Sequence, residues 1–480
     1  MLDELIEERR RKLARVRAGA DPYPATVART ETLAAARAAV LAGQHDARSV
    51  AGRVVSWRDQ GKIIFADLDD GTGKLQVILD ANELGSEMFS HLVETVDVGD
   101  FLSVTGNPLT TKRGEPSIAA VAATIAAKSL RPVPTTWYGL SDTELRLRKR
   151  YLDLIADPGV RELFRKKSSF WRAMREELVH AGFLEVETSV LEQVPGGADA
   201  TPFVTHHNAL DQDFFLRISL ELPLKKLLVG GFEKVFEIGR IFRNEGIDRD
   251  HLQDYTQMEC YAAYWDHQQM MAFVAGLYCH VAEATWGSTV TTFGDVILEW
   301  GGTWREVDYV DAFAAATGVN PLTADREALT AVAAKLALPV DPTLGTGRLI
   351  DLIYKKTVRP TLIEPCFLVG HPLIISPLAK ADPDRPGRAL RFQVLAAGTE
   401  VGNGWAELND PDEQRKRFEE QMALREAGDE EAQRIDEDFI EALEYGMPPT
   451  AGFGLSERLF AVMADKPIRE TVFFPPMRNA

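Results

Sequence analysis

The stretch Val235 to Tyr264 carries side chains that could bind a charged ligand. Its β-branched and aromatic residues alternate with polar ones, a turn rich in Gly and Asp follows, and a second strand-like run begins at Tyr255, so a long hairpin is predicted. The polar candidates on this hairpin are Arg243, Glu245, His251, Glu259 and Tyr261. A guanidinium can bind a phosphate, and carboxylates can bind a cation. The alternative is a set of solvated cross-strand ion pairs, which are common on strands.

Further polar candidates lie outside this hairpin. In the C-terminal quarter, a predicted strand would place Asn403, Trp405 and Glu407 on one face. The pair His206 and His207 could suggest a metal site, but no third ligand follows at a useful spacing, so none is expected there. No Ser-His or Cys-His arrangement stands out, and any catalysis is therefore expected to work by positioning.

The composition limits the class of protein. A chain of 480 residues with 45% hydrophobic content can bury two or more cores, and no apolar run reaches the roughly 18 to 20 residues that cross a membrane. The first residues are charged, unlike a signal peptide. Three scattered cysteines indicate ordinary thiols in a reducing cytosol, so a cytoplasmic location and no membrane partner are expected. The net charge of −18 argues against a general nucleic-acid coating protein, although local basic patches could hold one RNA.

Four parts are predicted to position these residues. Residues 1–48 are a basic, mostly helical segment whose first helix ends in the turn-forming stretch Ala18 to Pro24. Its basic face is either a solvated helix surface or a contact for an RNA backbone. Residues 49–130 contain five short strands separated by Gly and Asp turns, the number in an OB-fold barrel. These strands are expected at Arg53–Trp57, Lys62–Asp67, Lys74–Leu79, Phe101–Gly106 and Ser117–Ala122.

The remaining chain is predicted to be a linker and one large domain. Residues 131–158 form the linker, with a basic helical run after Thr143, and residues 159–480 form the domain. Its first helix is expected over Arg161 to Ala181, with a strand after it. Later helices are expected over Gln269–Thr285 and Glu327–Leu336. The predicted fold class is therefore α+β.

Several stretches resemble one family, and the likeness runs from about Arg9 to Asn479. F-R-N-E, a loop and T-x-M-E-x-Y resemble motif 2 of the class II aminoacyl-tRNA synthetases. The helix and strand over 161–190 resemble motif 1, and G-M-P-P-T-A-G-F-G-L-S-E-R-L resembles motif 3. P-G-G-A-D-A-T-P-F-V-T-H-H-N-A-L and L-R-I-S-L-E-L-P-L-K-K-L-L-V-G-G-F resemble the lysyl-tRNA synthetases of bacterial type. The resemblance implies a class II synthetase catalytic domain, in which an antiparallel β-sheet is flanked by helices, after an OB-fold barrel.

The resemblance also implies sites for lysine, ATP and magnesium. The lysine site would contain Gly197, Glu221, Glu259, Tyr261, Asn403, Trp405 and Glu407. The ATP site would contain Arg243, Glu245, His251, Tyr255, Glu400 and Arg458, with Arg243 and Arg458 as catalytic residues. Mg²⁺ would be held with ATP by Glu400 and by Gln393, seven positions earlier. Because lysine has an ammonium at both ends, it can be desolvated only against paired carboxylates, which three glutamates would supply.

The predicted barrel resembles an anticodon-binding domain. Its sequence G-K-I-I-F-A-D-L-D-D-G-T-G-K-L-Q-V-I-L resembles the OB domain of lysyl- and aspartyl-type synthetases. The resemblance implies that Phe65 stacks on an anticodon base and Gln76 hydrogen-bonds one, with Arg58 and Glu115 nearby. Stacking of one base on an aromatic side chain contributes roughly 1 to 3 kcal/mol to the free energy of RNA binding. From the residues alone, Phe65 would instead belong to the barrel core.

The chain departs from the family pattern at several positions. Ser189 replaces a proline of motif 1, and Gln393 replaces a metal-binding carboxylate, which should weaken the metal site because an amide adds no charge. Motif 3 is one residue shorter than usual. The motif 2 loop reads H-L-Q-D-Y from His251, where the family has H-N-P-E-F.

The implied function is that of a homodimeric lysine–tRNA ligase. Such an enzyme activates L-lysine with ATP to lysyl-adenylate and transfers the lysyl group to the 3′ end of tRNA(Lys). Two alternatives remain open. One is a paralogue that lysylates a protein, although such paralogues typically lack the barrel. The other is a tRNA-binding homologue with weakened catalysis, which Gln393 and the short motif 3 would favour.

Overall fold

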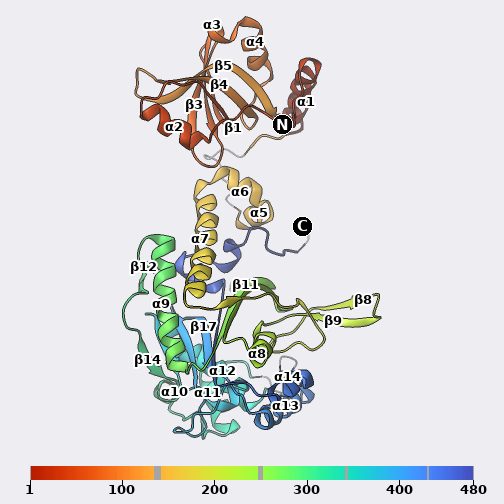
Figure 1. Cartoon of the computed structure of the whole chain (residues 1–480), viewed down its shortest axis with the longest axis vertical. Helices are drawn as coiled ribbons and strands as arrows, with labels where there is room; N and C mark the ends of the chain where they lie inside the picture. Colours follow the sequence, from red (N-terminus) through yellow and green to blue (C-terminus); the bar gives the residue numbers. More distant parts are fainter. Residues whose placement is uncertain (1, 134–141, 247–251, 341–343, 430–431, 479–480) are drawn as a thin grey trace. The chain divides into compact units, whose positions relative to one another are not determined.

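The chain forms two compact units, which Figure 1 shows. The computed structural model describes residues 2–133, 142–246, 252–340, 344–429 and 432–478. The first unit is Met1–Arg161 and the second is Glu162–Ala480. The division of the chain into four parts stays a prediction, and residues 134–141 of the predicted linker lie outside the described residues. In the described ranges, no helix is both long and apolar enough to cross a membrane.

A closed five-stranded barrel forms the centre of the first unit. Its strands follow the order β1-β2-β3-β5-β4 and are β1 (Arg48–Asp59), β2 (Ile63–Asp69), β3 (Lys74–Asp80), β4 (Phe101–Thr110) and β5 (Pro116–Ala127). In β2, the alternate residues Ile64, Ala66 and Leu68 are completely buried, as expected for a strand with one face on a core. The predicted barrel is confirmed, and each strand continues beyond its predicted C-terminal end.

The first unit also contains helices. They are α1 (Leu2–Gly19), α2 (Leu33–Leu41), α3 (Ala81–Leu84), α4 (Ser86–Thr95), α5 (Thr143–Arg148) and α6 (Arg150–Ala156). The first helix ends within the predicted turn. Part of its basic face is bonded inside the unit, because Arg9 donates to the Val98 carbonyl at 2.9 Å and Lys12 pairs with Asp97 at 2.7 Å.

The second unit is organised by an eight-stranded sheet. From one edge to the other, its strands are β14 (Arg305–Asp308), β15 (Cys366–Val369), β16 (Arg391–Ala396), β17 (Thr399–Ala406), β18 (Thr450–Ser456), β11 (Asp254–Ala263), β10 (Lys234–Phe242) and β6 (Leu184–Glu185). Among the described strands of this sheet, only the pairs β14/β15 and β6/β10 are parallel. The predicted hairpin is β10 and β11, and the predicted α+β class with a largely antiparallel sheet is confirmed.

Helices and two small sheets complete this unit. The helices are α7 (Pro158–His180), α8 (Glu221–Val229), α9 (His267–Trp286), α10 (Tyr309–Thr317), α11 (Arg326–Lys335), α12 (Thr346–Thr357), α13 (Pro411–Glu426), α14 (Glu437–Glu444) and α15 (Arg458–Met463), with 3₁₀ turns η1 (Arg359–Thr361), η2 (Leu373–Ile375) and η3 (Ile468–Thr471). The small sheets are β7 (Leu191–Glu192), β8 (Val204–His207) and β9 (Gln212–Leu216), and β12 (Val290–Phe293) with β13 (Val296–Glu299). The three predicted helices correspond to α7, α9 and α11.

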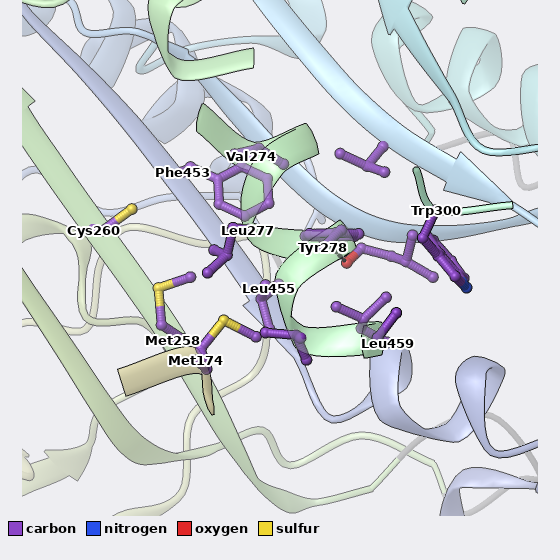
Figure 2. Packing of buried hydrophobic residues seen from close by; sticks show 14 of the residues in the cluster. Met174, Met258, Cys260, Val274, Leu277, Tyr278, Trp300, Phe453, Leu455 and Leu459 are labelled. Carbon is purple, nitrogen blue, oxygen red and sulfur yellow. Dashed lines mark hydrogen bonds between the residues drawn. The ribbon is translucent and has the colours of Figure 1, made fainter. Parts of the chain in front are cut away.

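The large sheet has one apolar face, packed against α9. On β11, Met258, Cys260 and Ala262 are buried in the main core. Figure 2 shows Met258 and Cys260 pointing toward side chains of α9 and toward Phe453 and Leu455 of β18. Because successive strand residues point to opposite faces, the residues between them must lie on the other face of the sheet. That other face is where the polar candidates gather.

Candidate active site

A cavity of about 690 Å³ lies in the second unit, on the polar face of the large sheet. Its lining includes every described residue that was predicted for lysine, ATP or metal: Gly197, Glu221, Arg243, Glu245, Tyr255, Glu259, Tyr261, Gln393, Glu400, Asn403, Trp405, Glu407 and Arg458. The volume is in the range of small-molecule sites. The structure therefore brings candidates that are far apart in the sequence, from Gly197 to Arg458, into one site. Their individual roles stay predictions, and His251 lies outside the described residues.

Strand register explains why these residues meet. One row across the sheet pairs Tyr261 with Gly452, Gly452 with Trp405, and Trp405 with Arg391. The next row on the same face pairs Glu259 with Gly454, Gly454 with Asn403, and Asn403 with Gln393. Each row thus has polar or aromatic side chains on β11, β17 and β16, and a glycine on β18 between them.

The glycines of β18 leave a trough between these side chains. A Cβ atom at Gly452 would lie 2.1 Å from Oε1 of Glu407 and 2.4 Å from Cε1 of Tyr261. A Cβ at Gly454 would lie 3.2 Å from Cγ of Glu259. Gly452 has no room for any side chain, since real Cβ atoms essentially never approach within 3 Å. Glycine here provides close approach of the strand to the site.

Glu259 is fixed by hydrogen bonds on both carboxylate oxygens. Oε1 accepts the Ser219 hydroxyl at 2.8 Å, the Leu220 backbone N–H at 2.9 Å and the Gln257 amide at 2.5 Å. Oε2 accepts the Tyr261 hydroxyl at 2.8 Å. Glu259 is only 3% exposed, and these bonds hold its position before any ligand binds.

The two other acidic residues share one buried lysine. Nζ of Lys225 lies 2.5 Å from Oε1 of Glu221, one helical turn away on α8, and also pairs with Oε2 of Glu407. Burial raises the pKa of both carboxyl groups above the ordinary value, although Lys225 opposes the shift. Burial alone would lower the pKa of Lys225, but Glu221 and Glu407 outweigh it and raise that pKa.

The arginine side of the cavity is suited to phosphate. Arg243 follows the last residue of β10, its Nε donates to the Ile218 carbonyl at 3.2 Å, and its guanidinium lies 5.8 Å from the centre of the Tyr255 ring. Arg458 is the first residue of α15, and its backbone N–H bonds the Ser456 hydroxyl at 3.3 Å. Two guanidinium groups in one cavity can bind a polyphosphate.

Gln393 and Glu400 are in direct contact. The Gln393 amide donates to Oε2 of Glu400 at 3.1 Å, and its oxygen accepts the Tyr354 hydroxyl at 3.1 Å. Across the ranges that the structure describes, no three His, Cys, Asp or Glu side chains are grouped to hold a metal ion. A single carboxylate of this kind still suits Mg²⁺, which is commonly held by one or two carboxylates together with substrate phosphates and water.

The sequence interpretation missed several residues in the cavity lining or directly behind it. Lys225 is four residues after Glu221, a spacing that places both on one helix face, and this was the available signal. Arg391 alternates with Gln393 along β16; it donates to Asn403 at 3.2 Å and lies 5.7 Å from the Trp405 ring centre. Gly452 carried no signal, because its importance depends on contacts with β11 and with Glu407. His206 binds Asp213 at 2.8 Å on an exposed hairpin outside the cavity.

The four predicted anticodon residues lie in the first unit on or beside the barrel. Register pairs Arg58 with Phe65 and Asp67 with Gln76, so the partly exposed Phe65 and Gln76 lie on the outer face of adjacent strands. Arg58 forms an ion pair with Asp67 at 2.8 Å, and Glu115 forms one with Arg37 at 3.0 Å. The Ser117 hydroxyl donates to Oε1 of Gln76 at 3.0 Å. Phe65 is thus outside the barrel core.

Comparison with known proteins gives matches to both units. The family "tRNA synthetases class II (D, K and N)" matches residues 142–478, and the family "OB-fold nucleic acid binding domain" matches residues 49–126. A protein named lysine–tRNA ligase from Roseiflexus castenholzii is 45% identical over 484 residues, which cover 99% of each chain. Proteins of the same name from Moorella thermoacetica and Shouchella clausii are 44% and 42% identical, over at least 99% of this chain and 97% of theirs.

Proposed function

Because this chain belongs to the class II tRNA synthetases (D, K and N), we propose that it joins L-lysine to tRNA(Lys), with ATP converted into AMP and diphosphate. The observation that supports lysine as the amino-acid substrate is a cluster of buried carboxylates in the cavity, Glu221, Glu259 and Glu407. An ammonium leaves water at low cost only when carboxylates replace its hydration. An aspartate substrate would need cationic groups at these positions instead.

The proposed first step forms an adenylate. An oxygen of the lysine carboxylate attacks the α-phosphorus of ATP, a new O–P bond forms, and the bond from the α-phosphorus to the diphosphate leaving group breaks. Arg243 stabilises the negative charge that develops on the α-phosphate oxygens. Arg458, Glu245 and His251 position the nucleotide, and Tyr255 flanks the adenine. Gly197, with φ +79° and no room for a Cβ beside Ser219 and Glu221, lets the backbone approach the amino acid closely.

The proposed second step needs no protein nucleophile. A ribose hydroxyl at the 3′ end of the tRNA attacks the activated carbonyl, and AMP leaves. Among the described residues that line the cavity, His371 has no hydrogen-bond partner on either ring nitrogen, so it forms no Ser-His or Cys-His pair. The contribution of the protein is therefore to hold the two reactants in register.

We also propose that Mg²⁺ accompanies ATP at Glu400. The ion, when bound, would neutralise charge on the phosphates. Glu400 would hold it through a carboxylate oxygen, while Gln393, which donates to the other side of that carboxylate, orients it. Since Gln393 brings no charge, we expect weaker metal binding than a pair of carboxylates would give.

The barrel is proposed to read the anticodon of tRNA(Lys). Phe65 offers an aromatic face for a base, and Gln76 offers an amide on the neighbouring strand. Arg58 and Glu115 are held in ion pairs beside this face and are proposed to contact the same nucleotides. Base recognition by hydrogen bonds and stacking suits a unit whose acidic residues outnumber the basic ones between Ser49 and Leu130.

A homodimer in the cytoplasm is the proposed working form. The segment over 161–190 resembles motif 1, and apolar side chains are exposed on it and just after it: Val179, Leu184, Val190 and Leu191. A second copy would cover such side chains. Sedimentation velocity at micromolar concentration is expected to give the mass of two chains, and a single-chain mass would contradict this proposal. The cysteines Cys260, Cys279 and Cys366 are free, as suits a reducing compartment.

The decisive experiment is amino-acid-dependent ATP–diphosphate exchange with all twenty amino acids, followed by charging of tRNA(Lys). Exchange with lysine and charging of this tRNA are the expected results. Exchange with a different amino acid would reject lysine as the substrate. The absence of exchange with any amino acid, in protein that binds the tRNA, would instead support a binding protein with lost catalysis.

A further inference from the structure

Lys225 is buried behind the cavity lining and has no assigned role in the proposed reaction, yet it contacts two of the proposed lysine ligands, Glu221 and Glu407. Its side chain is completely buried, and it bridges Glu221 and Glu407 from the α8 side. A buried ammonium is costly unless it is paired, so this bridge is a fixed part of the folded site. It therefore changes what the two carboxylates can offer to a ligand.

The two oxygens of Glu407 have different surroundings. Oε2 accepts both Nζ of Lys225 and the indole N–H of Trp405, the latter at 2.7 Å. Oε1 is buried and has no hydrogen-bond partner among the described residues. Oε1 faces Gly452, where an added Cβ would lie 2.1 Å away. A buried carboxylate oxygen without a donor costs free energy, so the site is incomplete until a ligand supplies that donor.

The charges of the site match a ligand with two ammonium groups. Glu221, Glu259 and Glu407 are the acidic residues around the Lys225 bridge, and Lys225 neutralises one of these three charges. Two carboxylates then remain for the α- and ε-ammonium groups of lysine, while Arg243 is available for its carboxylate. Glu259 already accepts hydrogen bonds on both oxygens, whereas Oε1 of Glu407 is a buried acceptor without a partner among the described residues.

We propose that Lys225 is a specificity-determining positioning residue, which occupies Glu407 from one side so that a single carboxylate oxygen is presented to the substrate side chain. This inference rests on the proposed function. An ammonium is a compact charge that one oxygen can satisfy, whereas a guanidinium is a planar fork that binds best to both oxygens of a carboxylate. With Oε2 occupied, arginine cannot form the bidentate pair that would compensate its loss of hydration. The site thus selects lysine against arginine.

The test measures lysine and arginine side by side in ATP–diphosphate exchange. Lys225→Met removes the charge and keeps an unbranched side chain, and Trp405→Phe removes the indole N–H and keeps an aromatic ring. The kcat/KM ratio of lysine over arginine should fall on the order of tenfold in Lys225→Met, less in Trp405→Phe, and most in the double variant. Lys226→Met is the matched control: Lys226 pairs with Asp438 and Asp436, outside the cavity lining, and its replacement should leave the ratio unchanged.

The outcomes separate this inference from the proposed function. A purely structural role of Lys225 would lower kcat/KM for both amino acids equally, and an unchanged ratio would therefore overturn the inference while lysine-dependent exchange by the unaltered enzyme still stood. If Lys225→Met shows no cooperative thermal melting, the ratio in Trp405→Phe decides, and no change there overturns the inference. If the unaltered enzyme shows no exchange with lysine, the proposed function fails first and the inference falls with it.

Discussion

Arg243 is the residue on which the proposed adenylation depends most directly. Its guanidinium is held by a backbone carbonyl on one side and lies near the Tyr255 ring on the other. A donor that is already in place stabilises developing charge without reorganising during the reaction. The same residue has no part in the first unit, where tRNA recognition is proposed.

Replacing Arg243 should therefore separate chemistry from RNA binding. Arg243→Ala is expected to lower kcat for lysine-dependent exchange by roughly 100-fold or more, because one charge-stabilising donor is lost. The affinity for tRNA, measured by filter binding, should stay within about twofold. Arg175→Ala is the control, since Arg175 pairs with Glu185 on the exposed side of α7. Undiminished exchange in Arg243→Ala would contradict the proposed role of Arg243 in stabilising the α-phosphate charge.

Glu192 gives a prediction about stability and pH. Burial raises its pKa to about 8, with Asp436 and Glu259 adding to the shift and Arg217 and Lys226 opposing it. Its Oε2 atom is buried with no hydrogen-bond partner in the described chain. Because the folded state holds this proton more tightly than the unfolded state, the folded protein loses stability as the pH rises from about 4.5 to about 8.

Glu192→Gln should remove that loss. Between about pH 6 and pH 9, the free energy of unfolding of the unaltered protein is expected to fall by on the order of 3 kcal/mol more than that of the variant. Urea unfolding at the two pH values measures the difference. Glu176→Gln, on the exposed side of α7, is the control and should follow the unaltered protein. Parallel pH curves for Glu192→Gln would show that Glu192 ionises normally.

At the scale of elements, the sequence predicted those helices and strands whose apolar and polar residues repeat within the element itself. The β10–β11 hairpin follows from alternation of apolar and polar residues, and the helices α9 and α11 follow from helical spacing. A strand was predicted directly after the first helix, and β6 lies in that stretch, but its restriction to two residues depends on pairing with β10. The two-residue strand β7 was not predicted separately, because it exists only through pairing with β9. The same limit applied to the site: Glu259 and Tyr261 share a strand and were predicted together, whereas the bridge from Lys225 to Glu407 joins residues far apart in the sequence.

The strand β18 gives the prediction that belongs to this scale. Gly452→Ala should raise KM for lysine on the order of tenfold, because the new methyl group collides with Glu407 and Tyr261, and should lower stability by about 1 to 3 kcal/mol. Exchange kinetics and thermal melting measure the two effects. The control is Gly276→Ala on α9, where no atom lies within 4 Å of the added Cβ and a small gain in stability is expected. Normal lysine kinetics in Gly452→Ala would mean that the trough is not the lysine site.

For the whole molecule, the two units predict two separable activities. Phe65→Ala should weaken tRNA(Lys) binding by roughly 1 to 3 kcal/mol, since one stacking face is lost, and should leave lysine-dependent exchange unchanged. Charging of tRNA at limiting RNA concentration should fall accordingly. Met88→Ala, on the partly exposed helix α4 of the same unit, is the control. A parallel fall of exchange and charging in Phe65→Ala would indicate damage to the second unit rather than loss of an anticodon contact.

The place of β18 in the sheet also has a consequence for co-translational folding. This strand begins at Thr450 and lies between two strands that are translated before it, β11, which ends at Ala263, and β17, which ends at Ala406. At about 5 to 20 residues per second, roughly 10 to 40 seconds separate the synthesis of β11 from that of β18. Until β18 is made, one edge of β11 stays unpaired, and β17 adds a second unpaired edge once it has been synthesised, so wrong strand pairing is a hazard. The enzyme can therefore acquire its complete active site only after β18 has been translated.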